Sequence, residues 1–168
     1  FLDTHYYGGI KHYQWVTLPL ALHGVVAKTD GTVVDVNVGD DAGDPVFCVT
    51  DLLPHLGNQQ MAKKGSEVVE GENLDVLIGN RPLKVEPADD ASDEEKEAAK
   101  EPVKAFALKL LEEKYGITEE DFLSAEIEVV PAGRARELGF DRSMVIGYGQ
   151  DDRVCAYTSL EAQLAIET

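Results

Sequence analysis

The dipeptide Asp30-Gly31 constrains the fold of this chain more than any other feature of its sequence. It stands in the segment TDGT, between the apolar run QWVTLPLALHGVVAK and the run TVVDVNVG. Asp-Gly between two apolar runs is the strongest short-range signal for a β-hairpin. In the second run valines occupy alternate positions, as in a strand with one buried face. The sequence therefore predicts two antiparallel strands joined by a turn at residues 29–32.

Further strands and two helices are expected along the rest of the chain. The segments PVFCVT, AEIEVVPAG and SMVIGYG each predict a strand. Apolar residues at helical spacing follow Pro102, and Gly116 is the expected C-terminal stop of this helix. A second amphipathic helix is expected from Asp152. Its apolar positions are Val154, Tyr157, Leu160 and Leu164. Strands mixed with helices in this order predict an α+β fold with a mainly antiparallel barrel or sandwich.

The charge of the chain limits its partners. It has 32 acidic and 15 basic residues and a formal net charge of -17. Such a field repels phosphate backbones and anionic lipid, so no nucleic-acid or membrane partner is expected. The same field attracts cations, metal ions included. The two cysteines, Cys48 and Cys155, lie far apart and fit no ligand or redox motif, so a reduced, cytoplasmic compartment is expected.

Two adjacent carboxylates, Asp151 and Asp152, stand where the segment SMVIGYG meets the expected final helix. Aspartate is a good N-cap residue, so a capping role explains Asp152 but leaves Asp151 unexplained. The end of a strand just before a helix is also where α/β enzymes place ligands. A carboxylate there can bridge two cations while its neighbour orients it. The residues alone leave the cap and the metal site as open alternatives.

The four histidines differ in their surroundings. His55 follows a proline in a predicted loop, and loops carry function more often than core elements do. A structural loop histidine is the alternative for this residue. His5 and His12 have no carboxylate at a ligand-like spacing, and His23 lies in a strand-like run. These three are expected to be surface or structural histidines.

The order and spacing of several segments resemble the aspartyl-aminopeptidase-like family of dinuclear zinc aminopeptidases. The segment THYYGGIKHYQWVTLPLALHGVV resembles that family's Tyr-Gly-Gly run, which a Trp and an apolar strand follow. The segment PVFCVTDLLPHL is similar to its Pro-led strand and Leu-rich loop with a His. Residues 117–162 resemble the return into the family's catalytic domain. The Gln-Asp-Asp-Arg form of the carboxylate pair is similar to the bacterial, clostridial-type branch.

The resemblance implies an α/β catalytic domain that is interrupted by an inserted β-rich lid or dimerisation domain. Residues 1–13 would be a flank of the catalytic domain. Residues 14–142 would be the inserted domain. Residues 143–168, a strand plus a helix, would begin the return into the catalytic domain. The chain would thus be a lid domain flanked by remnants of a catalytic domain.

The resemblance also assigns roles to three residues. By position, Asp151 matches the carboxylate that bridges two zinc ions, and Asp152 matches the neighbour that orients it. His55 matches a histidine that reaches into the active site of a neighbouring subunit, where it binds substrate or stabilises the tetrahedral intermediate. The implied assembly is a homo-oligomer of dimers built into dodecamers, and the implied reaction removes N-terminal residues from peptides with metal-activated water.

Some parts of the family's site do not occur in this sequence. The His-x-Asp motif that precedes the Tyr-Gly-Gly run is missing, as is the Glu-Glu pair, with its general base, that follows the bridging Asp. A catalytic zinc needs about three protein ligands. The chain by itself is therefore expected to be inactive and to bind zinc weakly or not at all. Two alternatives remain open, namely a non-catalytic oligomerisation or lid module and an unrelated acidic β-rich binding domain.

Overall fold

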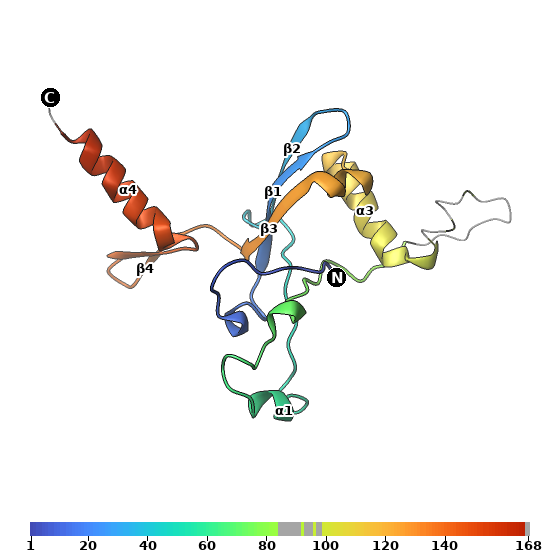
Figure 1. Ribbon diagram of the computed structural model, residues 1–168, viewed down its shortest axis with the longest axis horizontal. Helices are drawn as coiled ribbons and strands as arrows, with labels where there is room; N and C mark the ends of the chain where they lie inside the picture. The colour runs from blue at the N-terminus through green and yellow to red at the C-terminus, as the bar shows by residue number, and fades with distance from the viewer. Residues whose placement is uncertain (84–91, 93–95, 97–98, 167–168) are drawn as a thin grey trace. The chain divides into compact units, whose positions relative to one another are not determined.

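A computed structural model describes residues 1–83, 92, 96 and 99–166 of the chain. It divides into two compact units, Phe1–Ala132 and Gly133–Thr168. Antiparallel sheets and helices make the fold α+β, as predicted (Figure 1). No helix in the described ranges is long and apolar enough to cross a membrane.

The first unit is built on a three-stranded antiparallel sheet of order β2-β1-β3 (Figure 1). Strand β1, Leu20–Ala27, lies between β2, Val33–Val38, and β3, Ala125–Pro131. The sequence predicted a barrel or a sandwich. Within the described residues this sheet is open, with β2 and β3 at its edges, so a closed barrel does not form there.

The predicted strand PVFCVT makes single bridges instead of a ladder. Phe47 bridges to Leu20, and Cys48 and Val49 bridge to two other segments. Pro45 lies just before them and has no N–H to donate to a ladder. The prediction of a regular strand here is therefore wrong, although the segment does pair with its neighbours.

The predicted hairpin is confirmed between β1 and β2. Gly31 has a φ of 86°, a left-handed conformation that glycine adopts without steric cost. The Asp30 carboxylate accepts hydrogen bonds from the Thr32 hydroxyl at 2.6 Å and from the Thr32 backbone N–H at 2.9 Å. These bonds lower the pKa of Asp30. The turn brings Ala27 opposite Val33 and so sets the register of the two strands.

The remaining elements of the first unit are mostly short. They are η1, His12–Gln14; α1, Asn58–Met61; η2, Gly71–Asn73; α3, Pro102–Tyr115; and η3, Glu120–Ser124. The long helix α3 has a proline in its first turn, as predicted. It ends at Gly116, whose φ of 63° lets its N–H bond to the Glu112 carbonyl at 2.8 Å.

Two clusters of buried apolar side chains form the cores of the first unit. The first cluster is Leu20, Val49, Val69, Leu74 and Val76. The second cluster is Val26, Val36, Val38 and Ile117. Strand β1 contributes to both, with Leu20 at its start and Val26 near its end. The central strand thus links the two cores.

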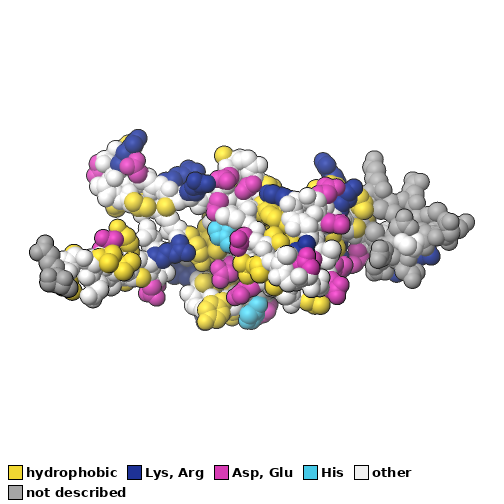
Figure 2. Space-filling model, turned by 90° about the horizontal axis from the view of Figure 1, so that it is seen from above, with side chains coloured by type: hydrophobic (Ala, Val, Ile, Leu, Met, Phe, Trp, Pro, Cys, Tyr) yellow, Lys and Arg dark blue, Asp and Glu magenta, His cyan; other side chains and the backbone are white. Residues whose placement is uncertain are grey.

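The second unit consists of a short hairpin and a helix. Strand β4, Arg136–Leu138, pairs with β5, Met144–Ile146, and α4 spans Gln150–Leu164, so the last predicted strand and helix are confirmed. No residue from 133 to 166 is buried. The apolar positions of α4 are 52% to 70% exposed, and apolar side chains are visible at the surface beside the grey C-terminal residues (Figure 2). The described part of this unit has no core of its own.

Gly24 lies at the middle of β1, opposite Val36 on β2 and Ile127 on β3. A Cβ atom at this position would overlap the Glu126 carbonyl oxygen and would lie 2.8 Å from the Ile127 Cα. Both are backbone atoms of β3, so the overlap could be relieved only by moving one strand away from the other. The sheet therefore requires glycine at position 24.

Substituting Gly24 by alanine should destabilise the chain by about 1–3 kcal/mol, the usual cost of overpacking. Gly43→Ala is the matched control, because no atom lies within 4 Å of a Cβ at that position. Urea unfolding can be followed by the fluorescence of the single tryptophan, Trp15, which packs against the first core cluster. Equal midpoints for the two variants would contradict the close approach of β1 and β3.

Asp121 is a buried carboxylate that ties η3 to the hairpin loop. It is 3% exposed. It accepts hydrogen bonds from the Thr118 N–H and hydroxyl, both at 2.9 Å, and from the Thr29 N–H at 3.2 Å. Chiefly the bonds from Thr118 hold the pKa of Asp121 below its ordinary value of 3.8. The ionised form is thus favoured by folding.

This lowered pKa predicts a pH dependence of stability. The contribution of Asp121 is fully present above pH 3.8, the value for the unfolded chain, and is lost as the pH falls through the lower folded value. Asp121→Asn should lower the thermal midpoint by several degrees at pH 7 and make it less dependent on pH below 3.8. Glu120→Gln is the control, since it removes a neighbouring charge and keeps these hydrogen bonds. Parallel pH profiles for Asp121→Asn and the unsubstituted chain would refute the role of Asp121.

Candidate functional site

Asp151 and Asp152 lie at the start of α4, just after β5. Gly149 precedes them in a left-handed conformation, with φ of 81°. Asp151 has a φ of -91° and a ψ of 117°, outside the helical region, and its peptide bond to Asp152 is cis. The Asp152 side chain makes no hydrogen bond to any other described residue. The capping alternative for Asp152 therefore lacks the hydrogen bond that would define it.

The two carboxylates border a hollow of about 520 Å³. Its lining residues are Tyr148, Gly149, Asp151, Asp152, Arg153 and Ala156. Both aspartates are exposed, and carboxylate oxygens are among the ligands that zinc takes in proteins. Among the described residues, however, no group of three or more His, Cys, Asp or Glu side chains could hold a metal ion. The hollow thus offers carboxylate ligands of a suitable kind without a complete ligand set.

His55 lies in the first unit, in a turn of residues 54–56 that precedes α1. The N–H groups of Leu56 and Gly57 both donate to the Leu53 carbonyl at 2.9 Å and close the turn. His55 is exposed, and its ring makes no polar contact within the described part of the chain. The imidazole is therefore available to a group from outside this unit.

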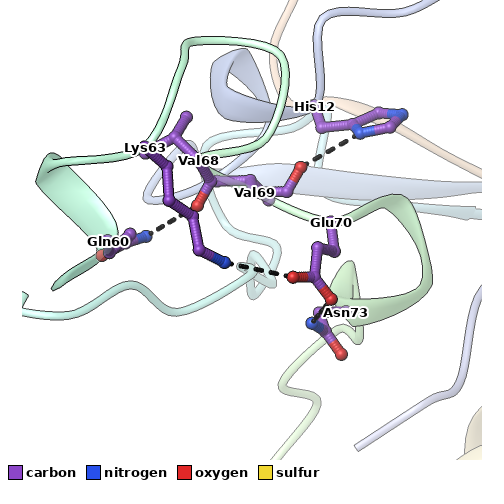
Figure 3. Close-up of polar contacts among 7 residues, drawn as sticks. All are labelled: His12, Gln60, Lys63, Val68, Val69, Glu70 and Asn73. Atoms are coloured by element: carbon purple, nitrogen blue, oxygen red, sulfur yellow. Dashed lines mark hydrogen bonds and ion pairs between the residues drawn. The ribbon is translucent and has the colours of Figure 1, made fainter.

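Gln60 holds the base of the loop that carries His55. Its side-chain amide donates to the Asp51 carboxylate at 2.8 Å and to the Val68 carbonyl at 3.3 Å, the second of which is drawn in Figure 3. Asp51 also accepts a hydrogen bond from the Leu52 N–H at 2.8 Å. These contacts connect both ends of residues 51–60 to the segment that follows.

The segment after this loop is fixed against the N-terminal residues. Figure 3 shows the His12 ring bonded to the Val69 carbonyl, at 3.1 Å, and an ion pair between Lys63 and Glu70, also at 3.1 Å. The Tyr6 ring lies 4.6 Å from that of His12, measured between centroids. His12 therefore has a structural role, as predicted.

The other two histidines also make surface or structural contacts, as predicted. His23 on β1 lies 3.1 Å from the Asp40 carboxylate. His5, which is 80% exposed, lies 3.9 Å from Glu72. Neither belongs to a cluster of potential metal ligands among the described residues.

Sequence reasoning missed two contributors to these surroundings, Gln60 and Arg153. A glutamine in a loop gives no signal of the carbonyl that it will reach. For Arg153 a signal existed, since a cation in the first turn of a helix is disfavoured by the helix dipole. Stabilisation of the helix therefore does not explain why an arginine stands at position 153.

The whole chain, residues 1–168, matches the model of the aminopeptidase I zinc metalloprotease (M18) family. A probable M18 family aminopeptidase 1 of Clostridium acetobutylicum is 60% identical over 166 residues, which cover 99% of this chain and 33% of that protein. A protein of the same description from Thermotoga maritima is 54% identical over 162 residues, which cover 96% of this chain and 33% of that protein. The chain thus spans about a third of the length of these curated relatives.

Solved structures agree with this match. The crystal structure of an M18 family aminopeptidase from Thermotoga maritima matches with a TM-score of 0.81 at 50% identity, covering 98% of this chain and 34% of that chain. The crystal structure of aminopeptidase I from Clostridium acetobutylicum matches with a TM-score of 0.78 at 58% identity, covering 99% of this chain and 34% of that chain.

The contacts of Gln60 predict how firmly the His55 loop is held. Gln60→Ala should speed hydrogen exchange at the backbone amides of Leu52, Leu56 and Gly57, because the loop loses both bonds at its base. Gln59→Ala is the matched control, since Gln59 is an exposed neighbour of the same type. Unchanged exchange in Gln60→Ala, measured by NMR, would show that the loop does not depend on this side chain.

Proposed function

The chain belongs to the aminopeptidase I zinc metalloprotease (M18) family, and on this basis we propose that it is part of a zinc-dependent aminopeptidase that removes N-terminal residues from peptides. The observation that carries the proposal is the match of all 168 residues to this family, with relatives up to 60% identical. Membership of the family excludes the alternative of an unrelated acidic β-rich binding domain.

In this proposal Asp151 is a carboxylate that bridges two zinc ions. Its support is the exposed position of Asp151 at the hollow before α4, where the carboxylate makes no hydrogen bond to any other described residue. Asp152, the adjoining residue on the same hollow, orients Asp151. Zinc bound there would polarise the peptide carbonyl and lower the pKa of a water molecule. The remaining ligands would come from outside the described residues.

His55 is proposed to act in the active site of a neighbouring subunit of a homo-oligomer, where it binds substrate or stabilises the tetrahedral intermediate. Its exposed ring sits on a braced turn, as this role requires. Leu52, Leu53 and Leu56 beside it are 56%, 65% and 73% exposed. A group of exposed large apolar side chains is typical of a contact surface. A structural histidine would be expected to bond within its own unit, which His55 does not do among the described residues.

The proposed organisation assigns residues 14–142 to an inserted lid domain and residues 1–13 and 143–168 to the catalytic domain. The exposed apolar face of α4 supports the last assignment, because a catalytic domain would cover it. The second candidate function is a lid or oligomerisation module without chemistry of its own. The two core clusters favour this second candidate, because the first unit buries them without help from any other part of the protein.

The role of Asp151 can be tested in the intact enzyme. Asp151→Ala should abolish peptide hydrolysis almost completely and lower the zinc content, since the bridging ligand is lost. Asp152→Ala should lower the rate of peptide hydrolysis roughly 10–100-fold, as is usual when a residue that orients a metal ligand is removed. Glu161→Ala, which removes an exposed charge further along α4, is the control and should leave peptide hydrolysis and zinc content unchanged. Full activity of Asp151→Ala would contradict the proposal.

Calorimetric titration of residues 1–168 alone should give weak zinc binding or none, because most of the zinc ligands would come from elsewhere. Tight binding of two equivalents of zinc would show that the site in this chain is complete.

Action of His55 across subunits can be tested by mixing two inactive proteins. One carries His55→Ala and the other Asp151→Ala. In a hybrid oligomer, an intact metal site of the first protein can receive His55 from the second, so part of the activity should return. Mixing Asp151→Ala with the double variant Asp151→Ala/His55→Ala provides no intact metal site and is the control. Absence of recovery in hybrids whose formation is verified would place His55 outside the neighbour's site.

A further inference from the structure

The side chain of Gln60 meets the loop that carries His55 on both sides of the turn. Its Nε2 atom donates to the Asp51 carboxylate at 2.8 Å, where the loop begins. Its Oε1 atom lies 3.3 Å from the position that a Cβ on Gly57 would take, just after the turn. Gly57 is buried, and its N–H bonds to the Leu53 carbonyl at 2.9 Å. One side chain therefore reaches both the start and the end of the segment that carries the histidine.

The second hydrogen bond of Gln60 goes to a segment that is itself held in place. The same Nε2 atom donates to the Val68 carbonyl at 3.3 Å (Figure 3). The next residue, Val69, belongs to the first core cluster, and its carbonyl is bonded to the His12 ring at 3.1 Å. Gln60 therefore connects the loop to a part of the chain that the core fixes.

A histidine that serves a neighbouring subunit needs such support within its own subunit. A displacement of about 1 Å from the productive geometry can cost a reaction roughly 100-fold. The leucines beside His55, which are Leu52, Leu53 and Leu56, are exposed, so they do not pack the turn against either core cluster of this chain. The polar contacts at the base of the loop are left to set its position.

We propose that Gln60 is a positioning residue for peptide hydrolysis, and that it holds His55 where the active site of the neighbouring subunit requires it. The inference rests on the proposed function, because it needs His55 to act across subunits. Gln60 touches neither substrate nor metal and acts through the loop. A primary amide suits this role, since its two N–H donors can serve Asp51 and Val68 at the same time.

Hybrid oligomers of the intact enzyme test this, because the substitution can be placed in one subunit type at a time. The parent hybrid joins a His55→Ala protein, which has the intact metal site, to an Asp151→Ala protein, which donates His55. Gln60→Ala in the donor protein should lower the recovered rate of peptide hydrolysis about 10–100-fold, because the acting histidine is then loosely held. The same substitution in the His55→Ala protein should lower it far less, because the loop of that subunit supplies no histidine to a working site.

Further variants separate the hydrogen bonds of Gln60 from the volume of its side chain. Gln60→Glu keeps the shape, but at neutral pH it donates to neither acceptor and sets a second carboxylate beside Asp51. In the donor protein it should therefore lower the recovered rate at least as much as Gln60→Ala. Adding Asp51→Asn to Gln60→Glu should restore part of the rate, because the new amide can donate to the introduced carboxylate. Gln59→Ala, at an exposed neighbour of the same type, is the matched control and should have no effect in either protein.

Two results would overturn the role of Gln60 and leave the proposed function intact. One is an equal loss with Gln60→Ala in either protein, which would show that this side chain supports the fold alone. The other is full recovery with Gln60→Ala in the donor protein. If Gln60→Ala does not fold, Gln60→Glu with and without Asp51→Asn decides the same question. A parent hybrid that forms but recovers no activity would instead defeat the proposed role of His55, and this inference with it.

Discussion

The close backbone packing at Gly24 underlies the architecture of the first unit. Because this residue has no side chain, β1 can lie against β3 on one side and pair with β2 on the other. The same strand then carries Leu20 into one cluster of buried side chains and Val26 into the second. The two clusters are thereby coupled through one strand. A disturbance at its middle would reach both cores, although neither core contains Gly24.

The candidate functional groups lie outside these cores, on segments held by polar contacts. The turn with His55 projects from a loop whose base Gln60 fastens to Asp51 and Val68. Asp151 and Arg153 lie on a helix start whose shape depends on the left-handed Gly149. In both places a firm backbone presents side chains that make no polar contact with other described residues. That combination is what a site shared with other parts of a protein requires.

Local signals in the sequence account for much of the fold. Asp30-Gly31 and Gly116 were sufficient to place a hairpin and a helix end, because both depend on conformations that glycine adopts within a few residues. The pairing of β1 with β3 joins segments about 100 residues apart, and no local pattern indicates it. The apolar spacing of α4 predicted a helix correctly but could not say what covers its apolar face. Because Asp151 and Asp152 are adjacent, the sequence alone predicted that they share one location, whereas nothing in the sequence indicated that the Arg153 side chain lies beside Gly149.

The absence of buried residues between 133 and 166 has a consequence for the order in which such a protein matures. Synthesis on the ribosome proceeds from the N-terminus, so the first unit, with both of its cores, is complete soon after it leaves the exit tunnel. The hairpin and α4 emerge next with apolar side chains still in water. In the proposed enzyme, these side chains would be buried only when the catalytic domain folds around them. The boundary near Gly133 would then separate a part of the chain that buries its own apolar side chains from a part that depends on other polypeptide.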